Sequence, residues 1–324
     1  MLRHNLKALF NPEQYHGWGK NQRFFEGWYY KVVSKDEQHA FAFIPGIAMD
    51  DEGRQQAFVQ VLDGKQLKAA YHRYEAEAFV PTPGTFDTRV GESRFRRDGI
   101  TLNLPDVSGS LQFHDSVPWP SSWYSPGIMG PFSFVPFMQC YHGILSMDHS
   151  ISGVLDFENG SVDFEGGRGY MEKDWGRSFP SGYIWMQTNH FSEKGISIKS
   201  SIAKIPRLMS SFVGFISGVW LYDRLIQFTT YNLTRLRKVH ADKDRVEIVM
   251  ENNRHRLEIL AHREAATALA SPILGFMDGR IEESMTSTVN VQLTDKKAKR
   301  LLLDDVGRNA GLEVAGKFEE VLVG

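Results

Sequence analysis

The chain has 324 residues, with 37 lysines and arginines against 39 aspartates and glutamates. Its hydrophobic content of 42% and charged content of 23% are typical of a globular protein. The net charge of −2 lacks the excess of positive charge that binds nucleic acid, so the sequence predicts no nucleic-acid partner. The single cysteine, Cys140, rules out an internal disulfide and a cysteine-based zinc site.

The sequence shows neither a targeting segment nor a membrane span. Its opening residues, MLRHNLKALFNPEQYHGW, lack the apolar core of roughly 7–15 residues that defines a signal peptide. The longest uncharged run, 116–147, contains five prolines and cannot form one helix. We therefore predict a cytoplasmic location and no transmembrane segment. Transient contact with a membrane surface and the oligomeric state are left open.

Residues 1–23 are expected to form a short helical or irregular leader, and from Phe24 onward the pattern is that of short β-strands. These runs are rich in aromatic and β-branched residues and are bounded by turn-forming residues. In the first half they lie at 24–33, 39–48, 57–64, 69–79, 93–99, 100–105, 109–115, 143–157 and 161–175. In the second half they lie at 183–191, 195–205, 211–222, 224–233, 245–252, 255–264, 287–295 and 299–305.

Four dipeptides between these runs are typical of hairpin turns, because Asn, Asp and Gly tolerate a positive φ. They are Asp63-Gly64, Asp98-Gly99, Asn159-Gly160 and Asn252-Asn253. One or two helical turns are expected near 265–269, and no long amphipathic helix is. Many short strands at tight spacing predict an all-β fold of sandwiches or barrels. At this length we expect two β-rich domains that meet near the Phe179-Pro180 turn.

Between 116 and 142 lies a segment rich in proline and aromatic residues, which we call the proline–aromatic segment. Proline stiffens a loop without requiring strand partners. We expect this segment to form a wall or lid over a pocket. Its candidate lining residues are Trp119, Trp123, Phe132, Phe134 and Phe137.

The stretch 169–191, GYMEKDWGRSFPSGYIWMQTNHF, is the densest cluster of polar and aromatic residues in the chain. Its second half alternates, so Trp185, Gln187 and Asn189 share one face of a predicted strand. Buried amides need hydrogen-bonding partners. This face is therefore an unusual lining for a plain hydrophobic core, and it favours a binding surface or a domain junction.

Three stretches resemble the tocopherol cyclase family: FFEGWYYKV (24–32), PFSFVPFMQCYHGILSMDHSISG (131–153) and the stretch 169–191. A fourth, 268–293, resembles it more loosely. They occur in the same order over nearly the whole chain. The resemblance implies two lipocalin-like antiparallel β-barrel or sandwich domains packed against each other, which we place at 1–178 and 179–324. It also implies a relation in fold to carotenoid hydratases.

The resemblance implies a hydrophobic small molecule as substrate, an isoprenoid or a prenylated aromatic such as a prenylated quinol. Tocopherol cyclases protonate an alkene, and the phenol oxygen attacks the resulting tertiary cation to close a chromanol ring. This reaction needs no metal or redox cofactor, so none is predicted. It requires an acid that stays protonated through burial. It also requires aromatic faces beside the cation and an apolar pocket.

Two glutamates are the candidate catalytic acids. Glu26 shares a face of its predicted strand with Trp28 and other aromatic residues, which would raise its pKa. Glu172 shares a face with Tyr170 and Asp174, so a like charge lies near it. Plant cyclases have an asparagine where this chain has Asp174, which moves the role of acid towards Glu172.

Structural ion pairs are the alternative for both acids. Glu26 would then pair with Arg23, Lys31 or Arg168. Glu172 would form, with Lys173, Asp174 and Arg177, a network of salt bridges that fixes the turn between the domains. The candidate substrate-binding residues could also have purely structural roles. A tryptophan more often packs in the hydrophobic core, and an amide side chain can cap a strand edge. These candidates are Trp28, Tyr29, Trp175, Trp185, Gln187 and Asn189.

Other chemistries find little support. No two histidines have the spacing of a metal site, and the GGxG run at 166–169 is flanked by strands and not by a strand and a helix. The sequence favours acid-assisted cyclisation or hydration of an alkene. The alternative is a non-catalytic lipocalin-like carrier of a hydrophobic small molecule. A carbohydrate-binding module ranks last, because it needs Trp119, Trp123 or Trp185 on an open surface.

Overall fold

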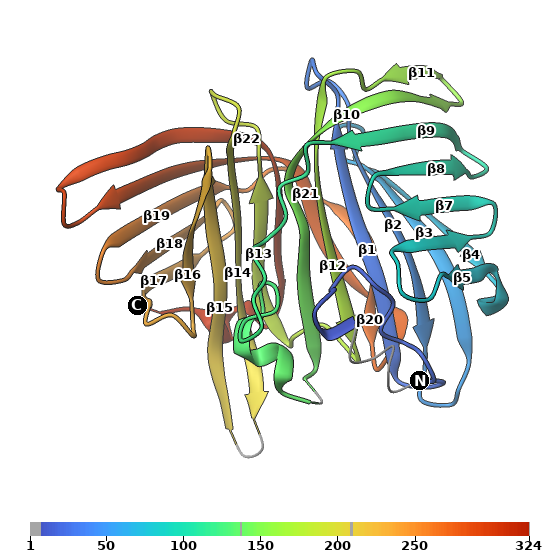
Figure 1. Cartoon of the computed structure of the whole chain (residues 1–324), viewed down its shortest axis with the longest axis horizontal. Helices are drawn as coiled ribbons and strands as arrows, with labels where there is room; N and C mark the ends of the chain where they lie inside the picture. Colours follow the sequence, from blue (N-terminus) through green and yellow to red (C-terminus); the bar gives the residue numbers. More distant parts are fainter. Residues whose placement is uncertain (1–7, 137, 208–209, 324) are drawn as a thin grey trace. The chain divides into compact units, whose positions relative to one another are not determined.

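The computed structural model describes residues 8–136, 138–207 and 210–323. Regular structure in these residues is almost entirely antiparallel β-strand, arranged in two sheets (Figure 1). This confirms the expected all-β class. The described residues also include three short 3-10 helices, η1 (Ala76–Ala78), η2 (Gly130–Phe134) and η3 (Phe318–Val321), and Ala8 and Leu9 are helical.

The chain divides into two compact units. Unit 1 contains the described residues up to Phe179 together with Leu269–Arg280, and unit 2 contains Pro180–Ala268 together with the described residues from Ile281 onward. Each unit has its own sheet and its own core. The bounds 1–178 and 179–324 stay a prediction for independently folding domains.

Unit 1 is built on a twelve-stranded sheet with the order β4-β3-β2-β1-β12-β10-β9-β8-β7-β6-β5, and β11 pairs with β10. The central strands are the longest, while β5 to β8 are short and joined by tight turns. The strands are β1 (Phe24–Val33), β2 (Ala40–Met49), β3 (Gln55–Asp63), β4 (Lys68–Tyr74), β5 (Phe79–Pro81), β6 (Asp87–Val90), β7 (Ser93–Arg96), β8 (Gly99–Asn103), β9 (Val107–His114), β10 (Cys140–Phe157), β11 (Gly160–Asp163) and β12 (Gly167–Gly176).

Unit 2 is built on a ten-stranded sheet with the order β16-β15-β14-β13-β22-β21-β19-β18-β17, and β20 pairs with β21. Its strands are β13 (Gly182–Thr188), β14 (Ile196–Arg207), β15 (Ser210–Leu221), β16 (Arg224–Thr229), β17 (Arg235–Ala241), β18 (Arg245–Glu251), β19 (His255–His262), β20 (Thr267–Ile273), β21 (Phe276–Asp295) and β22 (Arg300–Gly316). The four turn dipeptides that the sequence indicates connect paired strands, which confirms those hairpins.

The segment Leu269–Arg280, which contains most of β20 and the start of β21, belongs to unit 1 although its strands are part of the ten-stranded sheet. The backbone of Ala270 exchanges hydrogen bonds with the Gln60 side chain, and the Met49 amide donates to the Gly275 carbonyl. The helical turn expected at 265–269 is wrong, because β20 begins at Thr267 and pairs with β21. Strand pairing overrides the weak helical propensity of the alanines there.

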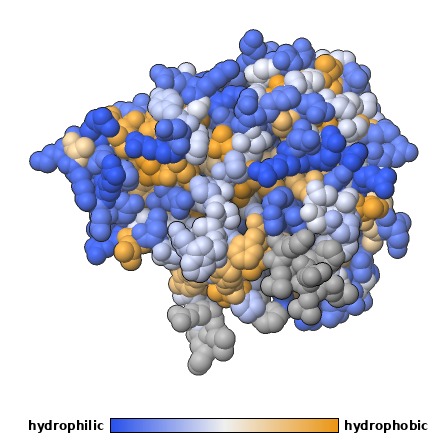
Figure 2. Space-filling model, viewed as in Figure 1, coloured by the Kyte–Doolittle hydropathy of each residue, from blue (hydrophilic) through white to orange (hydrophobic). Residues whose placement is uncertain are grey.

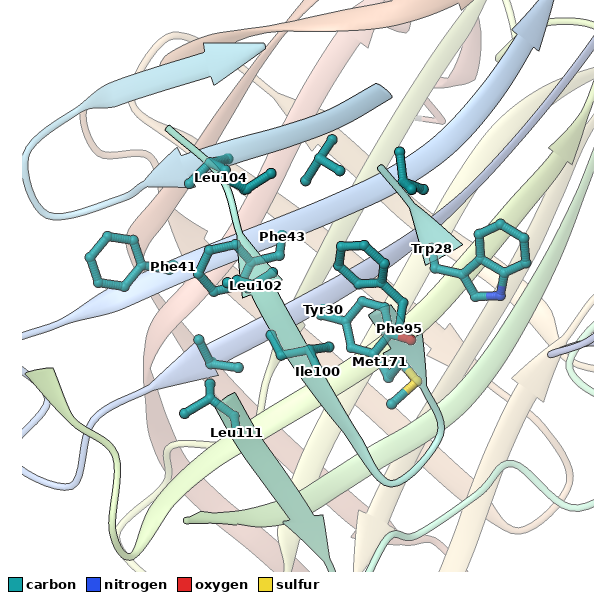
Figure 3. Packing of buried hydrophobic residues seen from close by; sticks show 14 of the residues in the cluster. Trp28, Tyr30, Phe41, Phe43, Phe95, Ile100, Leu102, Leu104, Leu111 and Met171 are labelled. Atoms are coloured by element: carbon teal, nitrogen blue, oxygen red, sulfur yellow. The ribbon is translucent and has the colours of Figure 1, made fainter. Parts of the chain in front are cut away.

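The inner face of the unit 1 sheet is filled by its own side chains (Figure 3). Trp28 is fully buried there and stacks on Phe86, with ring centroids 5.6 Å apart and planes 13° apart. Tyr30, Phe95 and Met171 pack beside it. Truncating one such aromatic side chain typically costs about 3–5 kcal/mol. These side chains form a packed hydrophobic core within unit 1.

The core of unit 2 follows the same alternation. Ile184 and Met186 of β13 are fully buried and pack with Ile198 of β14 and Val291 of β21. Because side chains alternate along a strand, Trp185 and Gln187 point to the opposite face of β13. The sequence pattern predicted this division of faces.

The described residues include no helix that is both long and apolar enough to cross a membrane. Hydrophilic side chains predominate on the face drawn in Figure 2, with smaller hydrophobic areas between them. Transient membrane contact and a cytoplasmic location stay predictions.

Candidate active site

A cavity of about 520 Å³ lies in unit 1, where β10 begins and β12 ends. This volume is within the range of small-molecule pockets. Three parts of the chain line it: the leader before β1, the proline–aromatic segment, and the ends of the two strands. The lining residues are Leu9, Pro12, His16, Lys20, Phe24, Pro126, Ser133, Phe134, Val135, Pro136, Met138, Tyr141, His142, Trp175, Gly176 and Arg177. The expected role of the proline–aromatic segment as a pocket wall is thus confirmed.

Only part of that segment's aromatic set reaches the cavity. Phe134 lines it and meets Phe10 edge-on, with ring centroids 6.1 Å apart. Trp119 is buried elsewhere, Trp123 is 81% exposed, and Phe137 lies outside the described residues. A sugar-binding surface would need Trp119, Trp123 or Trp185 to be exposed. Trp123 is exposed, whereas Trp119 and Trp185 are buried.

The cavity borders the first part of β10. β9 pairs only with the second part of β10, Ser150–Phe157. The first part of β10 pairs with β12 on one side, and within the described residues no strand pairs with Cys140–Leu145 on the other. Tyr141 and His142 point to alternate faces of this edge, and both border the cavity.

Three stacked rings form one wall of the cavity. Trp175 lies between His16 and Tyr141, with centroid distances of 4.1 and 5.6 Å and interplanar angles of 11° and 10°. Gly143 lets the leader approach this wall, since a Cβ there would lie 2.8 Å from the Pro12 Cβ. The stack presents aromatic faces to an apolar space, which is where a developing cation is stabilised.

Beneath the stack lies a buried cluster of Glu26, Lys173 and His16. Lys173 and Glu26 form an ion pair in which neither side chain is exposed to solvent. The His16 amide donates to both Glu26 oxygens at 3.0 Å, and the Lys173 ammonium donates to His16 Nδ1 at 2.9 Å. His16 Nε2 is 3.1 Å from the Ala8 carbonyl, so a neutral ring with its proton on Nε2 satisfies both contacts.

The electrostatics of this cluster keep Glu26 ionised. Burial acts to raise the pKa of Glu26, but Lys173 and His16 outweigh burial and hold it below its ordinary value. Burial lowers the pKa of Lys173 to about 8 against the opposing pull of Glu26. Burial and Lys173 together lower the pKa of His16 to about 4. The expected rise in the pKa of Glu26 is therefore wrong, and its partner is Lys173, which the sequence did not single out for it.

A second cluster, of His142, Glu172 and Asp174, occupies the opposite face of β12. His142 lies directly across from Asp174 in the strand register, with His142 Nδ1 2.7 Å from Asp174 Oδ1. His142 Nε2 is 3.6 Å from Glu172 Oε2, and the Tyr170 hydroxyl donates to that oxygen at 2.5 Å. Burial and the Glu172 charge raise the pKa of Tyr170 well above its ordinary value, so it stays a hydrogen-bond donor.

The same three side chains can hold a metal ion. Each offers one ligand atom, and these atoms all lie within 4.8 Å of one another. Nitrogen and carboxylate oxygens are ligands that zinc accepts. Spacing along the chain does not reveal this set, because the histidine lies on β10 and the carboxylates lie on β12. Both histidine nitrogens already face carboxylates, and that arrangement equally suits a shared proton.

The structure divides the other expected site residues among three places. Trp28 is fully buried in the core of unit 1, where its Nε1 donates to the Glu13 carbonyl at 3.0 Å and Lys173 lies 4.6 Å from its ring. Tyr29 is paired in register with Glu172 and is therefore on the face opposite Trp28. Of the four aromatic residues predicted to bind substrate, Trp28, Tyr29, Trp175 and Trp185, only Trp175 is among the residues that line this cavity.

Trp185, Gln187 and Asn189 belong to unit 2. Trp185 packs over Gly311, where a Cβ would lie 2.7 Å from its ring. Gln187 pairs in register with Gly311 on β22 and Lys199 on β14. All three side chains are buried.

The sequence predictions assign no role in the site to His16 or His142, and they include Lys173 only in the salt-bridge network around Glu172. The sequence of β12 does contain a usable signal. Lys173 shares a strand face with Met171 and Trp175, and a lysine on such an apolar face needs a buried counter-ion. The position of His142 opposite Asp174 depends on the register between β10 and β12. Spacing along the chain does not reveal that register.

Comparisons with known proteins agree with this architecture. A family model described as tocopherol cyclase-like matches residues 106–316. A probable chloroplastic tocopherol cyclase of Oryza sativa subsp. japonica is 23% identical over 96% of this chain and 79% of its own length. The chloroplastic tocopherol cyclase of Zea mays is 22% identical over 96% of this chain and 78% of its own length.

Solved structures with a similar fold have very different sequences. CghA with Sch210972 superposes with a TM-score of 0.57 at 10% identity, covering 90% of this chain and 88% of that one. Kievitone hydratase from Nectria haematococca gives 0.53 at 8% identity, covering 91% and 90%. These likenesses show the lipocalin-like fold alone. With the family model spanning well over half of the chain, the protein belongs to the tocopherol cyclase-like family.

Proposed function

We propose that the protein binds a prenylated hydroquinone or a related isoprenoid in the cavity of unit 1 and catalyses acid-assisted cyclisation, or hydration, of its alkene. The observation that carries the proposal is the apolar cavity in which an aromatic stack and a histidine–carboxylate cluster meet at one strand edge. Family membership supports the reaction type. The names of the cereal relatives point to chromanol ring closure.

The apolar lining suits the prenyl chain. Leu9, Phe134, Val135 and Met138 supply hydrophobic contact. Each buried methylene contributes about 0.8 kcal/mol, so a chain of two or three isoprene units provides ample binding energy. The aromatic stack then lies beside the chain, where its outer ring, Tyr141, presents a π face to positive charge on a neighbouring carbon.

In the proposed reaction Glu172 is the proton donor and His142 carries the proton to the cavity. His142 borders the cavity, and its Nε2 lies 3.6 Å from the Glu172 carboxylate. Protonation of the less substituted alkene carbon leaves a tertiary cation. The phenol oxygen attacks that cation and its proton returns to the histidine–carboxylate cluster, so the product is an isomer of the substrate. In hydration a water molecule replaces the phenol oxygen.

Glu26 has a supporting part in this proposal. Its carboxylate is tied to Lys173 and to the His16 amide, so it has no proton to give near neutral pH. It holds the leader in place beneath the cavity, and the leader contributes Pro12 and His16 to the lining. Contact of substrate with Trp185, Gln187 or Asn189 stays a prediction.

The test is incubation of the purified protein with geranyl hydroquinone in heavy water. A cyclase releases a product with the composition of the substrate and one deuterium that does not exchange back. Hydration adds the mass of one water molecule in addition to the deuterium label. Saturable binding without any product over several prenyl quinols would contradict catalysis and leave the protein as a carrier.

A further inference from the structure

The mouth of the cavity carries two positive charges. Lys20 and Arg177 both line it, and both side chains are exposed. The Lys20 ammonium lies 4.5 Å from the centroid of the Phe24 ring. Burial and the charge of Arg177 lower the pKa of Lys20, although Glu26 opposes them. The two cations thus lie close enough to repel each other at the edge of an apolar space.

No carboxylate balances this pair within the cavity. None of the described lining residues is acidic. In the part of the chain that the structure describes, neither Lys20 nor Arg177 forms an ion pair, whereas Arg94, Arg168 and Arg237 each pair with a carboxylate. Such unpaired cations facing an apolar cavity fit a ligand that has one anionic end.

The negative charges nearby are separated from this mouth. Glu26 is already paired with Lys173 beneath the ring stack. Glu172 and Asp174 lie on the opposite face of β12 from Trp175. Arg177 follows Asp174 by three residues, which is about 10 Å along an extended chain. An anionic head at the mouth and a proton donor at His142 therefore occupy different ends of the site.

We propose that the preferred substrate is a prenylated aromatic acid, whose ring carboxylate pairs with Lys20 and Arg177 while its prenyl chain fills the apolar cavity. This inference rests on the proposed function for the apolar part of the ligand and adds the charge of its head group. A neutral quinol would leave the two cations without a counter-ion.

The experiment compares two probes that differ in charge alone, 3-geranyl-4-hydroxybenzoate and 3-geranyl-4-hydroxybenzamide. Calorimetric titration measures affinity without requiring turnover. At low salt the benzoate is expected to bind about tenfold more tightly than the benzamide, and the difference should shrink as salt is raised. Lys20→Gln and Arg177→Gln should each weaken benzoate binding about fivefold, as expected for an exposed ion pair, and leave benzamide binding unchanged.

Arg89→Gln is the matched control, because Arg89 is an exposed arginine of unit 1 that does not line the cavity. It should change neither affinity. Equal binding of the two probes, or a preference for benzoate that survives both cavity substitutions, would overturn the inference. Selective binding of the benzoate without turnover would support it while the proposed catalysis fails. Turnover of neutral quinols without selective binding of the benzoate would support the proposed catalysis and overturn the inference about the charged head group.

Discussion

The two faces of β12 place similar ionisable groups in opposite situations. On one face Lys173 neutralises Glu26 within a solvent-free cluster that also fixes the leader. On the other face His142 lies between two carboxylates, 3.6 Å from Glu172 and 2.7 Å from Asp174. Burial alone therefore does not make a carboxylate an acid. The neighbouring charge decides whether a glutamate supports the fold or holds a transferable proton.

The largest effect is expected from Glu172→Gln. Loss of a general acid typically lowers kcat about 10²- to 10⁴-fold. The amide keeps the size of the side chain and can still accept the Tyr170 hydroxyl, so substrate affinity should change little. Steady-state kinetics with geranyl hydroquinone measures kcat, and calorimetric titration measures the affinity separately. A wild-type kcat would remove Glu172 from the mechanism.

The free energy of unfolding should depend most on the face of β12 that carries Lys173. Lys173→Met leaves Glu26 buried without its counter-ion and is expected to cost about 3–5 kcal/mol of unfolding free energy. The double variant Glu26→Gln/Lys173→Met removes both charges and should recover most of that loss. Urea denaturation of the single and double variants measures the coupling. Additive effects of the two substitutions would show that the pair does not act as a unit.

Stability should also fall in mild acid. The pKa of His16 is lowered to about 4 and that of His149 to about 3, in each case mainly by burial. Between pH 6.5 and 4 the unfolded chain binds protons that the folded chain excludes, so the unfolding free energy decreases as pH falls, by about 1.4 kcal/mol per unit for each histidine. His16→Gln should roughly halve the slope between pH 6 and 5. An unchanged slope would contradict the burial of a neutral His16.

A smaller effect is expected from the ring stack. Trp175→Leu keeps the cavity apolar but removes the middle ring that holds Tyr141 in the stack, which should lower kcat about tenfold, corresponding to a loss of about 1–2 kcal/mol of cation–π stabilisation. Trp123→Leu is the control, because Trp123 is exposed and does not line the cavity. Equal losses in the two variants would indicate a general effect and not stabilisation of a cation.

The comparison of faces also shows what the sequence can predict. Alternation correctly grouped Glu26 with Trp28, and Tyr170 with Glu172 and Asp174, because the side-chain period of a strand is fixed. The contacts that these residues make with neighbouring strands could not be predicted from the sequence. Lys173 on β12 pairs with Glu26 on β1, and the two residues are far apart in the sequence. That contact depends on strand order and register, which local pattern leaves undetermined.

The leader illustrates a second limit. It lacks the periodicity of a helix or a strand, so the sequence assigned it no role. The structure uses its backbone, since the Glu13 carbonyl accepts from Trp28 and the His16 amide donates to Glu26. Backbone contacts of this kind leave little trace in residue type. The proline–aromatic segment was easier, because its composition alone marks a stiff loop that lies outside a strand.

The most direct test of the central claim is a crystal structure of the protein with bound geranyl hydroquinone. The account predicts the prenyl chain in the cavity of unit 1, with its reactive alkene between Trp175 and His142 and its quinol ring towards Lys20 and Arg177. A ligand bound at full occupancy elsewhere in the molecule, with this cavity empty, would contradict it.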